Sequence, residues 1–315
     1  MQTNVGSPQG DSISGTFFNI ELETALRILR GKLNSRVTHI EHSYTKRSKI
    51  PAELEYADDT DFIYEDKEVG TYLKSIVKKT LGERNLKVNE DKTEETYINR
   101  EKEKGDEEWR KTKKLGSLLC DYEDMKRRVQ LANFAMSKAK VLFRKSKANS
   151  LRKVKIYKTL VKTVLTYNYS TWGLTKGETE EYNRCHRKIL RRISPNYWNL
   201  DNKELYKLCN EQEIEKDMLK ARWRTFGHIL RLPSEAPCQR AMDWYFETHG
   251  NNVKYRGNKR TTLPIVLDND IRTTNKFSCI EIKQFKTKED LKKLRCVAAD
   301  RKKWKDITAE ICKVA

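Results

Sequence analysis

Apolar residues recur at helical spacing near the start of the chain. Within residues 15–30, the side chains Phe18, Leu22, Ala25 and Leu29 stand at i, i+4, i+7 and i+11, which predicts an amphipathic helix. We expect this helix to end at Gly31, because glycine is a common C-terminal stop. The preceding loop, VGSPQGDSIS, holds two glycines and a proline, so its backbone can approach another molecule closely.

Two apolar arms between residues 54 and 64 predict a β-hairpin. Leu54 and Tyr56 precede a short acidic centre, and Phe62, Ile63 and Tyr64 follow it. Such arms separated by turn-forming residues are typical of paired strands. After the hairpin we expect a helix near 69–82, an extended piece at 86–98, an exposed linker at 99–111 and a brief strand at 114–119.

From Asp124 to the end of the chain the apolar pattern is helical, with the basic residues on the outer faces. A helix is expected over 201–209, capped by Asp201 or Asn202, and a longer one over 214–230. The remaining stripes are Leu131, Ala135, Ala139 and Leu142; Leu151, Val154, Tyr157, Val161 and Leu165; Tyr182, Cys185, Ile189 and Ile193; and, in one final helix over 290–314, Leu291, Leu294, Ala298, Ile307 and Ile311.

Composition narrows the class of protein. Of 315 residues, 37% are hydrophobic and 35% charged. The chain has no apolar run of about eighteen residues, so no membrane partner is expected, and its N-terminus lacks the basic start and apolar centre of a signal peptide. We therefore expect an intracellular protein of the nucleus or cytoplasm. The seven cysteines are scattered and never form a C-x-x-C pair, which indicates free thiols.

Two other groups of residues leave alternatives open. Cys185, His186, Cys209, His228 and Cys238 could be assembled into a zinc site, but their spacings match no structural zinc pattern, so part-buried side chains are the preferred interpretation. His228, in the segment FGHILRL, is expected to be a hydrogen-bonded packing residue rather than a phosphate contact.

The formal net charge of +20 is unevenly distributed. Residues 125–177, here called the basic stretch, contain fourteen Lys and Arg and no Asp or Glu. A surface that only needs solubility mixes both signs, so a one-signed stretch of this length indicates a polyanionic partner; the alternative is a solvated basic face without a partner. Phe134, Phe143, Tyr157 and Tyr167 lie among these charges and could stack on bases or belong to the core.

The acidic centre of the hairpin carries candidate chemistry. Asp58 and Asp59 are adjacent and Asp61 follows. Clustered carboxylates repel one another unless a cation neutralises them, and their oxygens suit a hard divalent metal. In nucleotidyl transfer, two magnesium ions activate the attacking oxygen and stabilise the leaving one. An isolated Asp-Asp pair is otherwise an ordinary turn.

The order of motifs resembles a reverse transcriptase of the non-LTR retrotransposon type. YADD at 56–59, preceded by VGSPQGDSIS and a helix, is similar to the palm of such enzymes. LKVNEDKTE at 86–94 is similar to the segment after the catalytic hairpin, and KLGSLL at 114–119 to the primer-contacting strand pair. Downstream, YNYSTWGLTK, CHRKILRRI, WRTFGHILRLP, RTTLP and AADRKKW resemble the region that follows the polymerase. The resemblance extends from the first residues to about Lys305.

The resemblance implies roles for individual residues. Asp58 would be a ligand of Mg²⁺, with Asp59 a weaker or auxiliary one. Lys92 would be a general acid toward pyrophosphate or, equally, a solvated lysine. Gln9, Gly10 and Tyr56 would line the pocket for template and nucleotide, with Leu115 and Gly116 at the primer grip. The basic helices would hold an RNA template and a DNA primer through phosphates, with contacts from Lys126, Arg127, Arg128, Lys138, Arg144, Lys145, Arg152 and Lys155.

Two departures from the family pattern limit this interpretation. Gly15 replaces the proline that usually starts the helix, which should loosen that start. The first catalytic aspartate of the family lies upstream of the glutamine loop, whereas this chain begins eight residues before Gln9. Asp58 and Asp59 alone are too few to assemble a two-metal site, so we expect no polymerase activity from the chain by itself.

The sequence therefore predicts an α+β protein: a partial reverse-transcriptase palm over 1–120, a basic helical thumb over 121–177 and a helical C-terminal region over 178–315. Its expected function is that of a retroelement RNA-directed DNA polymerase fragment. The alternative is a non-catalytic RNA- or DNA-binding module that uses the basic stretch, and a third is a degenerate element product that folds poorly.

Overall fold

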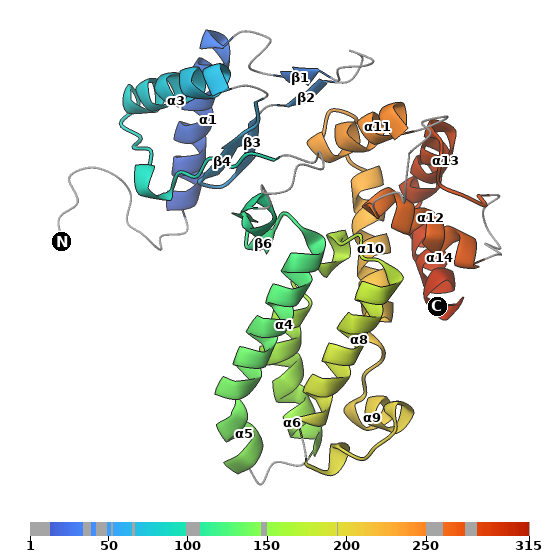
Figure 1. Cartoon of the computed structure of the whole chain (residues 1–315). Helices are drawn as coiled ribbons and strands as arrows, with labels where there is room; N and C mark the ends of the chain where they lie inside the picture. Colours follow the sequence, from blue (N-terminus) through green and yellow to red (C-terminus); the bar gives the residue numbers. More distant parts are fainter. Residues whose placement is uncertain are drawn as a thin grey trace. The chain divides into compact units, whose positions relative to one another are not determined.

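The protein forms two compact units in a computed structural model (Figure 1). The structure describes residues 13–33, 39–41, 49–51, 53–64, 67–98, 108–145, 150–193, 195–249, 261–274 and 282–314. Unit 1 contains the described residues up to Glu95 together with 233–249, and unit 2 contains those of 96–232 and 250–315. Helices predominate in both units, so the class is α+β with small sheets.

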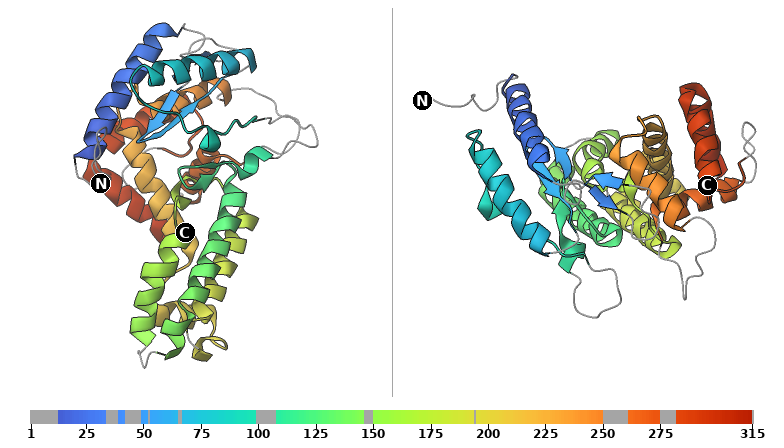
Figure 2. Two further views of the ribbon diagram at one scale, coloured as in Figure 1. Left: turned by 90° about the vertical axis from the view of Figure 1, so that its left-hand side faces the viewer. Right: turned by 90° about the horizontal axis from the view of Figure 1, so that it is seen from above.

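Unit 1 consists of helices and short antiparallel strand pairs. Its elements are α1 (Ser14–Lys32), β1 (His39–Glu41), β2 (Lys49–Pro51), β3 (Glu53–Tyr56), β4 (Asp59–Phe62), α3 (Lys67–Gly82), a 3₁₀ turn (Glu90–Lys92) and α11 (Pro237–His249). Within the described residues β1 pairs with β2 and β3 with β4. In both views of Figure 2, α1 and α3 lie side by side.

A small apolar core joins these elements. Leu22, Leu26 and Leu29 of α1 are buried, and Phe62 of β4 and Ile76 of α3 pack against them. The predicted helix and hairpin are confirmed. Two details differ from expectation: Phe18 is 38% exposed, and the helix continues through Gly31 to Lys32. The segment 86–98 forms no strand; the 3₁₀ turn interrupts it.

Unit 2 begins with a 3₁₀ turn (Glu108–Lys111) and a miniature hairpin, β5 (Lys113–Lys114) and β6 (Ser117–Leu118), instead of one brief strand. Its helices are α4 (Asp121–Lys138), α5 (Lys140–Lys145), α6 (Ser150–Tyr157), a π-helical segment (Lys158–Lys162), α7 (Thr163–Leu165), α8 (Lys176–Arg191), α9 (Asn202–Cys209), α10 (Ile214–Leu230), α12 (Leu263–Thr274), α13 (Lys288–Ala299) and α14 (Arg301–Val314), with short 3₁₀ turns at Tyr169–Thr171 and Pro195–Tyr197. None of the helices in the described part of the chain is long and apolar enough to cross a membrane.

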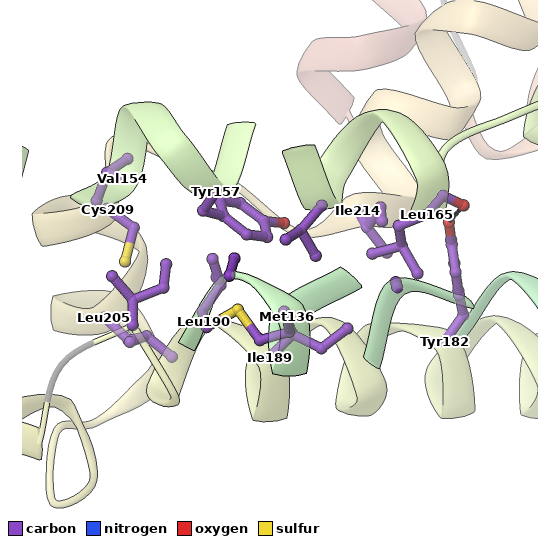
Figure 3. Packing of buried hydrophobic residues seen from close by; sticks show 14 of the residues in the cluster. Met136, Val154, Tyr157, Leu165, Tyr182, Ile189, Leu190, Leu205, Cys209 and Ile214 are labelled. Atoms are coloured by element: carbon purple, nitrogen blue, oxygen red, sulfur yellow. Dashed lines mark hydrogen bonds between the residues drawn. The ribbon is translucent and has the colours of Figure 1, made fainter. Parts of the chain in front are cut away.

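One apolar core runs through α4 to α10 (Figure 3). Tyr157 and Leu165 face Tyr182 and Ile189 of α8, and all four are almost fully buried. This core joins helices on both sides of residue 177, where we expected a domain boundary. The predicted stripes of α6 and α8 therefore belong to a single packed bundle.

Several expected core positions are corrected. On α4 the buried residues are Asp124, Met125, Arg128, Ala132 and Met136. In the predicted stripe, Ala139 is buried in the core and Leu131 and Ala135 are half-buried, whereas Leu142 is 47% exposed. The stripe is therefore correct at Ala139 and lies beside the buried face of α4 elsewhere. Leu151, at the start of the second stripe, lies in the first turn of α6 and is 70% exposed.

The predicted C-terminal helix is two helices. Its stripe is correct, since Leu291, Leu294, Ala298, Ile307 and Ile311 are all buried. The chain breaks at Asp300, whose carboxylate accepts hydrogen bonds from the backbone N–H groups of Lys302 and Lys303 at 2.9 and 3.1 Å. That carboxylate caps the start of α14, and the hydrogen bonds from Lys303 and Lys302 lower its pKa.

Candidate catalytic hairpin and nucleic-acid-binding surface

The turn of the β3–β4 hairpin presents the two candidate metal ligands. Tyr56 pairs with Asp59, so Ala57 and Asp58 form a two-residue turn. Ala57 has φ of 55°, a left-handed conformation that costs a non-glycine residue about 1–2 kcal/mol. Asp58 and Asp59 are both exposed, as is Tyr56. The sequence therefore predicted correctly that YADD stands at a hairpin tip.

A salt-bridge cluster fixes this hairpin on α1. Arg30 binds both carboxylate oxygens of Glu53, at 2.9 and 3.3 Å, and also contacts Glu55 and Glu23. Glu53 and Glu55 are two residues apart in β3 and so share one face of the strand. A hydrogen bond that the protonated Glu55 carboxyl donates to Glu53 raises the pKa of Glu55 to about 7, although Arg30 opposes this rise. The neighbouring Glu53 thus favours the protonated form of the Glu55 carboxyl.

The donor set at the tip does not fit a complete two-metal site. Within the described residues, no group of three or more His, Cys, Asp or Glu side chains could hold a metal ion. Asp58 and Asp59 supply carboxylate oxygens, the ligand type that Mg²⁺ prefers, but they stand without a third ligand in the described part of the chain. Two such carboxylates do not form the two-metal site that nucleotidyl transfer requires.

Lys92 does not contact the hairpin tip in the described part of the chain. Lys92 is exposed at the end of the 3₁₀ turn, where its backbone N–H bonds the Asn89 side chain at 3.3 Å. No hydrogen bond or ion pair links its ammonium group to Asp58 or Asp59, all three of which are described. Gln9 and Gly10 lie outside the described residues.

The β5–β6 hairpin holds the predicted primer-grip residues in a two-residue turn. Leu115 and Gly116 have φ of 46° and 82°, the positive values that a tight hairpin turn of this kind requires. Arg127 and Arg128 both donate to the carbonyl of Gly116, Arg127 at 2.8 Å. The Tyr167 hydroxyl donates to the carbonyl of Leu115 at 2.8 Å. The turn is therefore anchored to the helical bundle.

Asp124, which sequence reasoning did not assign to the site, is hydrogen-bonded to this hairpin. Its carboxylate is fully buried and accepts the backbone N–H of Leu118 at 3.0 Å and the indole N–H of Trp172 at 3.3 Å. The same carboxylate lies 3.6 Å from the Arg128 guanidinium. An acid just inside a predicted helix start, directly before the acid-free stretch, was the only sequence signal for this role.

Part of the basic stretch is neutralised by carboxylates. Lys126 pairs with Glu123 at 3.3 Å, and Arg127 and Arg128 pair with Asp124 at 3.6 Å. Farther along, Lys158 and Lys162 meet Glu211 and Asp217, which come from the α9–α10 region. The expectation of fourteen uncompensated charges was therefore wrong, because acids distant in sequence, or just outside the stretch, fold back onto it.

Among the residues predicted to contact phosphate, Arg128 is buried and contacts other parts of the protein. Its side chain is 6% exposed and lies over the Tyr167 ring at 4.2 Å while it binds Gly116. Lys138, Arg152 and Lys155 are exposed, and the Lys138 ammonium lies 4.6 Å from the centre of the Phe134 ring. The side chains of Arg144 and Lys145 lie outside the described residues.

The aromatic residues of the stretch divide in the same way. Phe143 and Tyr157 are buried in the bundle core, whereas Phe134 and Tyr167 are 59% and 47% exposed. Only the second pair could meet a ligand, and the Tyr167 hydroxyl is already bonded to Leu115. The exposed surface of the stretch therefore offers cations and few free rings.

Two histidines of unit 2 lie in different environments. His228 is exposed on α10, so the packing role predicted for it is wrong. His186 is the packed histidine: it is fully buried, and its Nε2 lies 2.8 Å from the Tyr157 hydroxyl. Burial lowers the pKa of His186 to about 3. The six described cysteines are all free thiols.

We compared the chain with known proteins. Nothing among the family models, the curated proteins or the solved structures matches this chain.

Proposed function

We propose that the chain is part of a retroelement RNA-directed DNA polymerase of the non-LTR type. The observation that carries the proposal is the β3–β4 hairpin, whose two-residue turn presents Asp58 and Asp59 within the YADD motif. Helices α1 and α3 pack against each other, and Phe62 of this hairpin packs against the buried face of α1, which is consistent with the helix-plus-hairpin palm that the resemblance implies. The anchored turn at Leu115 and Gly116 supports a primer grip in the expected order.

Substrate binding in this proposal belongs to the exposed cations of the thumb. Lys138 and Lys155 are exposed on α4 and α6 and carry no carboxylate partner within the described residues. A DNA primer on an RNA template would meet them through its phosphates, so binding is independent of sequence and weakens with salt. Magnesium would bind at Asp58 and Asp59 only when further ligands complete the site.

Binding of a primer–template tests the proposal. Fluorescence anisotropy should show tighter binding of a recessed DNA primer on an RNA template than of heparin with the same number of charges. Lys138→Glu with Lys155→Glu should weaken the primer–template complex. The matched control is Lys293→Glu, which makes the same change at an exposed lysine of α13. Absence of binding, or equal sensitivity to the control, would refute a role on primer–template.

The alternative function, a non-catalytic nucleic-acid-binding module, is favoured by the same exposed cations. It predicts equal affinity for primer–template, unprimed RNA and heparin, together with a steep fall of log K with log salt concentration. A flat dependence on salt would exclude it.

Primer extension with Mg²⁺ separates binding from chemistry. Because the tip offers two carboxylates without a third ligand in the described residues, we expect this chain alone to incorporate no nucleotide, and Asp58→Asn to leave primer–template affinity unchanged. Robust incorporation that Asp58→Asn abolishes would overturn the expected inactivity and would establish the polymerase directly.

A further inference from the structure

A cavity of about 400 Å³ opens on unit 2 at the C-terminal end of α8. Val129 and Asn133 of α4 and Cys185 of α8 line it. The helices α4 and α8 are in contact with each other, and both are labelled in Figure 1. Its volume is at the lower end of the range for ligand pockets, so it can take one small group and not a helix or a duplex.

Trp198 lines the same cavity and supplies a stacking surface. It follows the 3₁₀ turn at Pro195–Tyr197, and its side chain is 62% exposed, whereas the neighbouring Tyr197 is 4% exposed. A large aromatic ring that remains this open beside a cavity is available to a planar ligand. Stacking on such a ring suits any nucleobase, because every base has a π-face.

Three cations surround the cavity. Lys188, Arg191 and Arg192 lie on the last turn of α8 and at its C-cap, and all three line it. Arg192 donates to the Asn133 side chain at 2.7 Å, and Arg191 donates to the Asn202 side chain at 2.9 Å. These partners are neutral and position the guanidinium groups without cancelling their charge.

The charge of these cations is thus left for a ligand. No carboxylate is among the residues that line the cavity, and no ion pair involves Lys188, Arg191 or Arg192 within the described part of the chain. This differs from Lys162 in the same unit, whose ammonium group lies between Glu211 and Asp217. Uncancelled cations beside an exposed ring are the combination that binds phosphate and base together.

We propose that this cavity binds one nucleotide of a single-stranded nucleic acid, with its base stacked on Trp198 and the flanking phosphates held by the cations at the end of α8. Bases within a duplex are already stacked on one another, whereas those of a single strand can be splayed onto a protein ring. The inference rests on the proposed function, which it deepens by giving unit 2 a second surface that takes single strands.

Short labelled oligonucleotides of single-stranded RNA and DNA test the inference by fluorescence anisotropy. Trp198→Ala should weaken binding by roughly 5- to 150-fold, the loss of one stacked base, while Trp198→Phe should retain most of the affinity. The control is Tyr97→Ala, which removes a similarly exposed ring outside the cavity. If Trp198→Ala and Tyr97→Ala change the affinity equally, the inference is wrong.

Salt dependence measures the cations separately. Three phosphate contacts to a single strand correspond to a slope of log K against log salt near about −2, and removing one should reduce it by about 0.7. Lys188→Ala is therefore expected to flatten the slope, whereas Lys293→Ala, an exposed lysine of α13, should not. An unchanged slope for Lys188→Ala would overturn the assignment of phosphates to this site.

Alkylation of Cys185 locates the ligand without any substitution. This half-buried thiol lines the cavity, and Cys296 on α13 is exposed elsewhere. A bound oligonucleotide should slow maleimide modification of Cys185 and leave that of Cys296 unchanged, as measured by mass spectrometry of the peptides. Equal modification of Cys185 with and without oligonucleotide would contradict the inference.

The two proposals fail in different ways. Suppose that Lys138→Glu with Lys155→Glu abolishes binding of the duplex primer–template, while Trp198→Ala does not change binding of single strands. This result would refute nucleotide binding in the cavity and leave the proposed function standing. No binding of any nucleic acid would refute both. Binding of an acidic peptide that depends on Trp198 as strongly as oligonucleotide binding does would assign the cavity to protein segments and overturn the inference.

Discussion

Replacing Gly227 by alanine should strongly destabilise unit 2. Gly227 is buried in α10, and a Cβ added there would lie 2.5 and 2.6 Å from the Cε2 and Cδ1 atoms of Trp304. Real Cβ atoms do not approach other heavy atoms so closely, so the indole ring would have to move. The ring is 4% exposed, and its N–H donates to the carbonyl of Trp223 at 2.9 Å.

The size of the effect follows from three contributions. Overpacking of a filled core costs about 1–3 kcal/mol, and the clash with a rigid ring packed against Phe226 and Trp223 places this case at the upper end. Displacing the indole costs its hydrogen bond, about 1 kcal/mol. Alanine regains about 1 kcal/mol of helix propensity over glycine. The net loss of unfolding free energy is therefore about 3 kcal/mol.

Urea denaturation followed by circular dichroism measures this loss. The control is Gly177→Ala in the first turn of α8, where an added Cβ has no neighbour within 4 Å; it should be neutral or stabilise by up to about 1 kcal/mol. In a Trp304→Leu background, Gly227→Ala should cost much less, because the clash is gone. A cost of Gly227→Ala that is below about 1 kcal/mol, or unchanged by Trp304→Leu, would refute the reasoning.

Three further predictions concern buried or strained groups. The pKa of His186 is lowered from 6.5 to about 3, so the stability that comes from its neutral form is complete above pH 6.5 and is lost as pH falls toward 3. Between pH 7 and pH 5, urea titrations should therefore show that the wild type loses about 2 kcal/mol more unfolding free energy than His186→Gln does. Asp124→Ala leaves the Arg128 guanidinium buried without its carboxylate and should cost about 3–5 kcal/mol in the same assay, whereas a cost below 1 kcal/mol would show that the pair is unimportant. Leu115→Gly relieves a left-handed φ of 46° at a half-exposed side chain and should raise the thermal midpoint slightly, and a lowered midpoint would contradict the strain argument.

Local chemistry made parts of the fold predictable. Asp201 was expected as a helix cap, and its carboxylate accepts the backbone N–H of Glu204 at 2.8 Å. The bounds of α10 are those that the apolar pattern and flanking residues gave. The hairpin tip followed from two apolar arms around Asp58. In each case the signal lies within a few residues of the structure that it determines.

Long-range pairing explains the errors. Arg128 can be buried because its guanidinium lies beside the Asp124 carboxylate and donates to the Gly116 carbonyl. The buried face of α4 therefore contains an arginine, and for that reason the face looked polar in the sequence. The basic stretch looked unpaired because Glu211 lies about fifty residues beyond Lys158 and Lys162. The break at Asp300 lies between Ala298 and Ile307, which are both buried although they are nine residues apart. Nine residues make about two and a half helical turns, so one continuous helix would place the two side chains on opposite faces, and the prediction of a single helix overlooked this change of phase.

The division of the positive charge decides which variants can test function. Arg128 and Lys162 hold the bundle together through buried or half-buried carboxylates, so their substitution would weaken nucleic acid binding simply by unfolding unit 2. Lys138 and Lys188 are exposed and have no carboxylate partner in the described part of the chain, so a loss of binding on their substitution reports on a surface. A high count of basic residues is therefore weak evidence for a polyanion site, and the subset left unpaired after folding is the evidence that bears on it.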